Sequence, residues 1–173
     1  MASNKAKGAI GAGIAAMLTI AVPYTAGWEG KANDPYFDSA KVETVCYGDT
    51  QVAMRHYSDA ECAQLLRQKL ATVYAPQVVK VLPGIEEHRF AFAAFTDFSY
   101  NAGAGSLAKS PALLWKRGRY VEACRAMWAY KYAVGKILAG LVLRRAGAAN
   151  DNRISESDLC MVDAVPMAMG ISA

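Results

Sequence analysis

The sequence contains few of the side chains that bind metals or act as nucleophiles. Its two histidines, His56 and His88, lie far apart along the chain. None of the four cysteines belongs to a Cys-x-x-Cys pair, and no spacing of cysteine and histidine matches a zinc site. We therefore expect no metal ion, and we assign both histidines to surface or capping positions.

Glycine-rich phosphate loops, nucleic-acid-binding motifs and internal repeats are also missing. The formal net charge of +4 makes the chain mildly basic. This charge suits an anionic partner such as cell wall, nucleic acid or a lipid headgroup surface, but it does not choose among them. With no motif for a cofactor or for nucleic acid, we expect a monomer that uses neither.

A chain of 173 residues is long enough for one domain with a hydrophobic core. Residues 28–50 are rich in turn formers with short β-forming stretches, which predicts a small antiparallel sheet. Helical patterns follow at residues 58–74, 85–100, 110–115, 120–130 and 138–148. Four phenylalanines in 85–100 indicate a central, buried helix. The class is therefore α+β, and the chain after about residue 161 is expected to be frayed or disordered.

The N-terminal segment has the length of a membrane span. Lys5 and Lys7 precede an uncharged stretch, Gly8–Trp28, of 21 residues, which is long enough to cross a bilayer. The basic flank predicts a cytoplasmic N-terminus and an exported remainder. Many of the 21 residues are glycine or alanine, so insertion should be only marginally favourable.

Three interpretations of this segment compete. It can be a secretory signal cleaved after Ala26, a permanent anchor, or a helix that enters the membrane, leaves it and folds with the soluble domain. The small residues weaken the anchor interpretation, and a candidate catalytic residue follows the segment directly. We favour release. This divides the chain into an N-terminal helix, 1–28, and a catalytic domain, 29–173.

Export also bears on the cysteines, because an even number of them in an exported protein favours disulfides. Cys46 lies in the predicted sheet, and Cys62 lies in the first turn of the next predicted helix. The connection between them is short, so we predict that these two residues form a bridge.

Three residues in the turn-rich region could carry acid–base chemistry: Glu29, Asp38 and Thr44, in the spacing Glu-x8-Asp-x5-Thr. Glycoside hydrolysis needs a protonated carboxyl that donates to the leaving oxygen and a second group that handles water. A glutamate leaving an apolar helix into a cleft is desolvated, which favours its protonated form. An aspartate in a polar turn stays ionised. The alternative is that both carboxylates merely lie on the surface of a loop.

The spacing resembles that of the phage-type lysozymes of glycoside hydrolase family 24, particularly the lambdoid endolysins with a signal-anchor-release N-terminus. Further similarity extends over 29–145. It is carried by Tyr100-Asn101-Ala102-Gly103-Ala104-Gly105, Leu113-Leu114, Trp128-Ala129-Tyr130-Lys131 and Gly140-Leu141-Val142-Leu143-Arg144-Arg145. Two features depart from the family: Asp49 stands where many relatives have histidine, and an Ala/Gly/Asn-rich stretch replaces the usual charged helix after Arg145.

The resemblance implies a lysozyme-like fold with a small β-containing lobe and a larger helical lobe. It implies that Glu29 is the general acid, Asp38 orients water and Thr44 assists it. Arg144 or Arg145 would support the glutamate, and Tyr100 and Asn101 would border the sugar cleft.

The implied activity is that of an endolysin hydrolysing the β-1,4 bond between N-acetylmuramic acid and N-acetylglucosamine of peptidoglycan. The protein would first contact the host inner membrane through residues 8–28 and then act in the periplasm. A lytic transglycosylase and a catalytically silent, membrane-tethered wall-binding protein are the alternatives.

Overall fold

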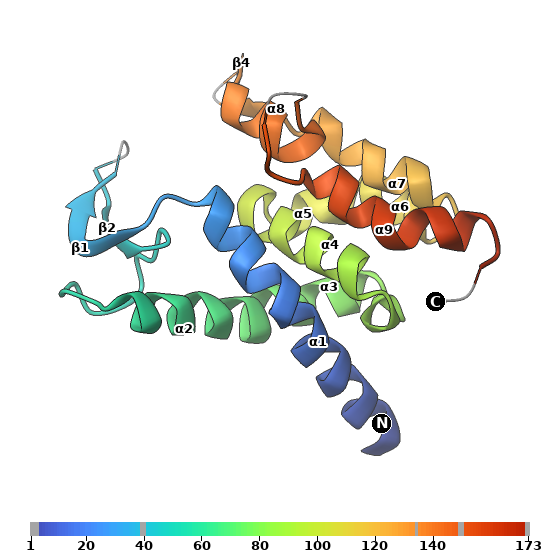
Figure 1. Ribbon diagram of the computed structural model, residues 1–173, viewed down its shortest axis with the longest axis horizontal. Coiled ribbons are helices and arrows are strands. Elements are labelled where there is room, and N and C mark those ends of the chain that lie inside the picture. The colour runs from blue at the N-terminus through green and yellow to red at the C-terminus, as the bar shows by residue number, and fades with distance from the viewer. Residues whose placement is uncertain (1–3, 39–40, 134, 149–150, 172–173) are drawn as a thin grey trace.

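The computed structural model describes residues 4–38, 41–133, 135–148 and 151–171, and it has the expected α+β architecture. The β1–β2 sheet lies on one side of the molecule, and helices form most of the rest, together with a second, short two-stranded sheet (Figure 1). The elements are α1 (Asn4–Trp28), β1 (Ala32–Phe37), β2 (Glu43–Cys46), α2 (Asp59–Lys69), η1 (Leu70–Tyr74), α3 (Ala75–Val81), η2 (Ile85–Glu87), α4 (Arg89–Ala102), α5 (Ala104–Leu107), α6 (Ser110–Trp115), α7 (Tyr120–Ala126), η3 (Met127–Ala129), β3 (Tyr132–Ala133), β4 (Lys136–Ile137), α8 (Ala139–Ala146) and α9 (Glu156–Ala168).

The predicted sheet is the antiparallel pair β1–β2, in which Tyr36 lies opposite Thr44. Val45 and Cys46 of β2 are fully buried in a small core shared with Tyr57 and Cys62. A disulfide joins Cys46 to Cys62, as predicted, and it attaches the sheet to the start of α2. The sequence did not reveal a second hairpin, β3–β4, because its strands are only two residues each.

Helix α2 begins at a capping box. The Ser58 side chain accepts a hydrogen bond from the Glu61 backbone, and the Glu61 carboxylate accepts one from the Ser58 N–H. The helical path does not stop at Tyr74, where the apolar pattern weakens, but passes through the π-helical turn η1 into α3. Pro76 lies in the first turn of α3, where its missing N–H is tolerated.

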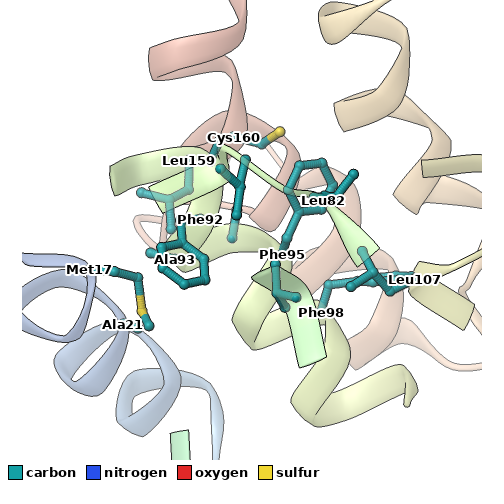
Figure 2. Packing of buried hydrophobic residues seen from close by; sticks show 14 of the residues in the cluster. Met17, Ala21, Leu82, Phe92, Ala93, Phe95, Phe98, Leu107, Leu159 and Cys160 are labelled. Carbon is teal, nitrogen blue, oxygen red and sulfur yellow. The ribbon is translucent and has the colours of Figure 1, made fainter. Parts of the chain in front are cut away.

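Helix α4 is the predicted central helix, although it begins at Arg89 and follows the separate turn η2. Phe92, Phe95 and Phe98 are fully buried. Figure 2 shows Met17 and Ala21 of α1 facing the part of α4 that carries Phe92, with α9 on its other side. The main core therefore forms where α1, α4 and α9 meet.

The expectation of a frayed chain after residue 161 was wrong for the segment up to Ala168, which belongs to α9. The Ser155 side chain caps this helix by accepting from the Asp158 N–H. A second disulfide joins Cys160 to Cys124 of α7. Burial of Leu159 and Ala164 against α4 and α7 stabilises a helix whose sequence lacks a strong apolar period.

Helix α1 is long and apolar enough to cross a membrane by length and composition, and it ends at the predicted boundary, Trp28. Here its C-terminal half packs into the core through Met17, Leu18 and Ala21. Most residues from 8 to 16 are exposed, and the N-terminal end of the helix projects beyond the body (Figure 1). That residues 1–28 act as a separate unit stays a prediction.

Two glycines of α1 differ sharply in their surroundings. A Cβ atom added to Gly13 would lie 2.6 Å from both the Cβ and the carbonyl oxygen of Glu86, whereas one added to Gly11 would meet nothing within 4 Å. Real Cβ atoms do not approach backbone so closely. Gly13 is therefore the point at which the docked helix requires a glycine.

We predict that Gly13→Ala destabilises the full chain by about 1–3 kcal/mol through this clash. Gly11→Ala is the matched control, because it gains the same helix propensity of at most about 1 kcal/mol without any contact. Urea denaturation of both variants measures the difference. Equal stabilities would contradict the docked position of α1.

Candidate active site

Glu29 directly follows α1, and its N–H donates to the Thr25 carbonyl, so it continues the last turn of the helix. Its side chain is 23% exposed. The Oε1 atom of Glu29 lies 2.6 Å from Nη1 of Arg144 in α8. The end of α1 is thus connected to a helix near the other end of the chain.

Arg144 contacts two further carboxyl groups, both fully buried. Its Nη2 and Nε atoms donate to the two oxygens of Asp97 in α4, at 2.7 and 3.1 Å. Its Nε atom also lies 3.3 Å from Oε1 of Glu156 in α9. One guanidinium therefore joins α1, α4, α8 and α9, and its charge is balanced by partners, as a buried ion requires.

Arg145 acts on the same cluster from its other side. It donates to Glu156 and to the side-chain oxygen of Asn101, and its guanidinium lies 5.0 Å from the centre of the Phe98 ring. The sequence left open which arginine meets Glu29. In the structure it is Arg144, while Arg145 holds Asn101 and Glu156.

Tyr100 links α4 to the segment that follows β2. Its hydroxyl donates to the Tyr47 carbonyl at 2.6 Å. Burial, assisted by the negative charge of Glu29, raises the pKa of Tyr100, so the phenol stays protonated and remains a donor. Close by, Asp49 forms an ion pair with Lys69 at 2.8 Å. These contacts fix the position of the sheet relative to the helices.

The structure brings Asp38 and Thr44 together through one residue, Val42. Asp38 accepts from the Val42 N–H at 2.9 Å, and the Thr44 hydroxyl donates to the Val42 carbonyl at 2.9 Å. Asp38 is partly exposed just after β1, whereas Thr44 is buried in β2. Because its proton is used on Val42, the Thr44 oxygen can act only as an acceptor toward a further partner.

Glu29 opens onto a hollow of about 330 Å³. Its lining residues are Trp28, Glu29, Asn101, Leu138, Gly140, Leu141, Arg144 and Arg153. A second hollow of about 400 Å³ shares Asn101, Leu138 and Leu141 with the first and adds Tyr130 and Tyr132. Together they form a groove beside α8 that has the volume of a small-ligand site.

Another hollow, of about 570 Å³, lies between α2 and the turn after β2. Its lining carboxylate, Asp49, is already held by Lys69. The groove at Glu29 is therefore the better candidate for acid–base chemistry.

Sequence reasoning missed Asp97 and Glu156. Asp97 could have been noticed, because it is an acidic residue in the middle of an aromatic helix and such a position needs a buried partner. Glu156 gave no comparable signal, since it follows a polar loop. Arg153 was also missed. It pairs with Asp151, and its guanidinium lies 4.0 Å from the centre of the Trp28 ring.

The chain is similar to known proteins in both sequence and fold. The family model described as "Phage lysozyme" matches residues 26–148. The chain is 34% identical over 150 residues to a "SAR-endolysin" of Bacteriophage PS119, covering 82% of this chain and 88% of that protein. It is also 34% identical over 145 residues to a "SAR-endolysin" of Enterobacteria phage P21, covering 79% of this chain and 86% of that protein.

Two solved structures show the same fold. The active form of the P1 phage endolysin Lyz matches with a TM-score of 0.69 at 23% identity, covering 86% of this chain and 93% of that one. The endolysin from Escherichia coli O157:H7 phage FAHEc1 matches with a TM-score of 0.67 at 21% identity, covering 82% and 90%. The expected lysozyme-like fold is confirmed.

Proposed function

This chain belongs to the phage lysozyme family, and from that premise we propose that it cleaves the β-1,4 bond between N-acetylmuramic acid and N-acetylglucosamine. It is a peptidoglycan-hydrolysing endolysin, an enzyme of the glycoside hydrolase type. The observation that carries the finer proposal is the position of Glu29. Its carboxyl is held by a buried arginine and opens onto a groove, and it directly precedes the β1–β2 hairpin, to which Asp38 and Thr44 belong.

In this proposal Glu29 is the general acid, which protonates the leaving glycosidic oxygen. Asp38, in a polar and partly exposed turn, orients the attacking water and accepts its proton. The Thr44 oxygen accepts a hydrogen bond from the same water, since its own proton is used on Val42. Attack by a separate water, without a glycosyl-enzyme bond, inverts the anomeric carbon.

A lytic transglycosylase is the second candidate, because it too needs a glutamate acid but forms an anhydro product without water. The shared attachment of Asp38 and Thr44 to Val42 favours hydrolysis, since it holds two water-binding groups on one hairpin. A protein that only binds the wall would need neither group.

We predict that Glu29→Gln lowers peptidoglycan hydrolysis by at least about 10²–10⁴-fold, because the amide cannot donate the acid proton. The fold should persist, since the amide oxygen still accepts from Arg144. Turbidity loss of cell-wall suspensions measures the rate, and Glu122→Gln, on the exposed face of α7, is the matched control. A Glu29→Gln variant that clears walls at the parent rate would remove Glu29 from the acid role.

The products should carry reducing ends rather than anhydromuramyl ends, as mass spectrometry of digested peptidoglycan can show. Asp38→Ala and Thr44→Ala should both slow this hydrolysis, with the threonine change the milder of the two because its hydroxyl only positions water. Anhydromuramyl ends as the main product would instead support the transglycosylase.

We also propose that α1 controls where the enzyme acts. The helix first lies in the host inner membrane with its N-terminus in the cytoplasm, and then leaves it and packs against α4 as a periplasmic monomer. While the helix is in the bilayer, Glu29 is kept at the headgroup level and cannot reach Arg144. The glycine- and alanine-rich face, which stays exposed after docking, makes the membrane state only weakly favoured.

Gly11→Leu combined with Ala15→Leu should hold the protein in the membrane, because both positions are exposed in the docked helix. Two leucines should favour the membrane state by about 1–2 kcal/mol, which changes the released fraction roughly tenfold. Fractionation of expressing cells and the time of lysis measure the effect. The serine pair at the same positions is the control and should be released at least as readily as the parent. A parent protein that begins after Ala26 would show signal cleavage and end the release proposal.

A further inference from the structure

The buried cluster around Arg144 contains more acids than bases. The carboxyl groups of Glu29, Asp97 and Glu156 surround the guanidinium groups of Arg144 and Arg145. Arginine stays protonated in proteins, so three ionised carboxylates would leave one uncompensated negative charge. Asp97 and Glu156 are fully buried, where such a charge is strongly unfavourable. One of the three carboxyls therefore holds a proton.

The hydrogen bonds identify which carboxyl it is. Both oxygens of Asp97 accept from Arg144, so Asp97 is the ionised partner. Only Oε1 of Glu156 accepts from the arginines, and its buried Oε2 has no donor among the described residues. Burial, followed by the charge of Asp97, raises the pKa of Glu156 well above its usual range.

Other titratable groups near the cluster do not change its balance of positive and negative charges. Tyr24 of α1 and Tyr100 of α4 face it, and burial raises the pKa of both phenols, so they stay neutral. Asp49, on the far side of Tyr100, is neutralised by Lys69. Arg153, beyond Trp28, is neutralised by Asp151. The charge balance is therefore set within the cluster itself.

We propose that Glu156 holds the proton of this cluster while Glu29 is ionised, and that Glu156 ionises when Glu29 takes up a proton. The proposal rests on the role of Glu29 as general acid, which requires its protonated form. In that form Glu29 no longer supplies an anion to Arg144, with which it is paired in the structure. Ionisation of Glu156 supplies a replacement anion to both arginines, so the cluster stays neutral in either state.

The two carboxyl groups exchange their protons with solvent, so the number of protons in the cluster stays the same. Glu29 takes its proton from the groove that it lines, and Glu156 releases one, so the protein carries one cluster proton before and after. The two carboxyls then titrate as a coupled pair. Glu156 does not line the groove and touches no substrate there. It is a positioning residue that acts through Arg144 and Arg145.

Carbon-13 NMR of the carboxyl groups tests this coupling without reference to activity. In the parent chain, one of the seven glutamates should show the chemical shift of a protonated carboxyl at neutral pH. In Glu29→Gln the arginines keep only Asp97 and Glu156 as acidic partners, so that signal should disappear as Glu156 ionises. In the control, Glu122→Gln, it should persist. A parent with every glutamate ionised, or a signal that survives in Glu29→Gln, would overturn the proposal.

The pH dependence of hydrolysis provides the second test, on Glu156→Gln. A glutamine at this position mimics the protonated acid but cannot ionise, so protonation of Glu29 would leave an unbalanced arginine. We expect the alkaline limb of the kcat profile to move to lower pH by about one unit, equivalent to tenfold. An unchanged limb would reject the coupling. If Glu29→Gln itself kept full activity, the acid assignment would fall, while the NMR result would still report on the proton of Glu156.

Discussion

The contact of Arg144 with three carboxyl groups is the interaction on which the rest of the structure depends. It is the point at which α1, α4, α8 and α9 are all held together. Hydrophobic packing places these helices near one another, but it does not determine the direction of a particular carboxyl. A buried guanidinium needs all its partners in defined positions. The orientation of the Glu29 side chain is therefore set by its ion pair with Arg144, and not by the position of α1 alone.

Much of the fold could be predicted, because it follows from local patterns. The capping box at Ser58 and the aromatic run of α4 each identify their element without any distant contact. Helix α9 could not be predicted in this way, because its stability comes from the disulfide to Cys124 and from packing against α4. The π-helical turn before Pro76 could not be predicted from the sequence either, because it continues a helix at a point where the apolar periodicity weakens.

In the candidate site, too, some residues could be predicted from local sequence and others depend on distant contacts. Glu29, Asp38 and Thr44 lie within sixteen residues of one another along the chain, so their spacing could be compared with that of a known family and predicted from that resemblance. The part that Asp97 and Glu156 play in the site can be recognised only from their contacts with Arg144, which lies 47 and 12 residues away in sequence. A buried charge is defined by its partners in space. Those partners become known only once the helices are packed.

The ion pair between Glu29 and Arg144 spans 115 positions of the chain. During synthesis, α1 leaves the ribosome first, and α8 is among the last elements to appear. A nascent or prematurely terminated chain that ends before α8 already contains Glu29, Asp38 and Thr44, yet it lacks the guanidinium that orients the glutamate. The order of translation therefore delays assembly of the site until nearly the whole polypeptide exists, so incomplete chains in the host carry the acid without its support.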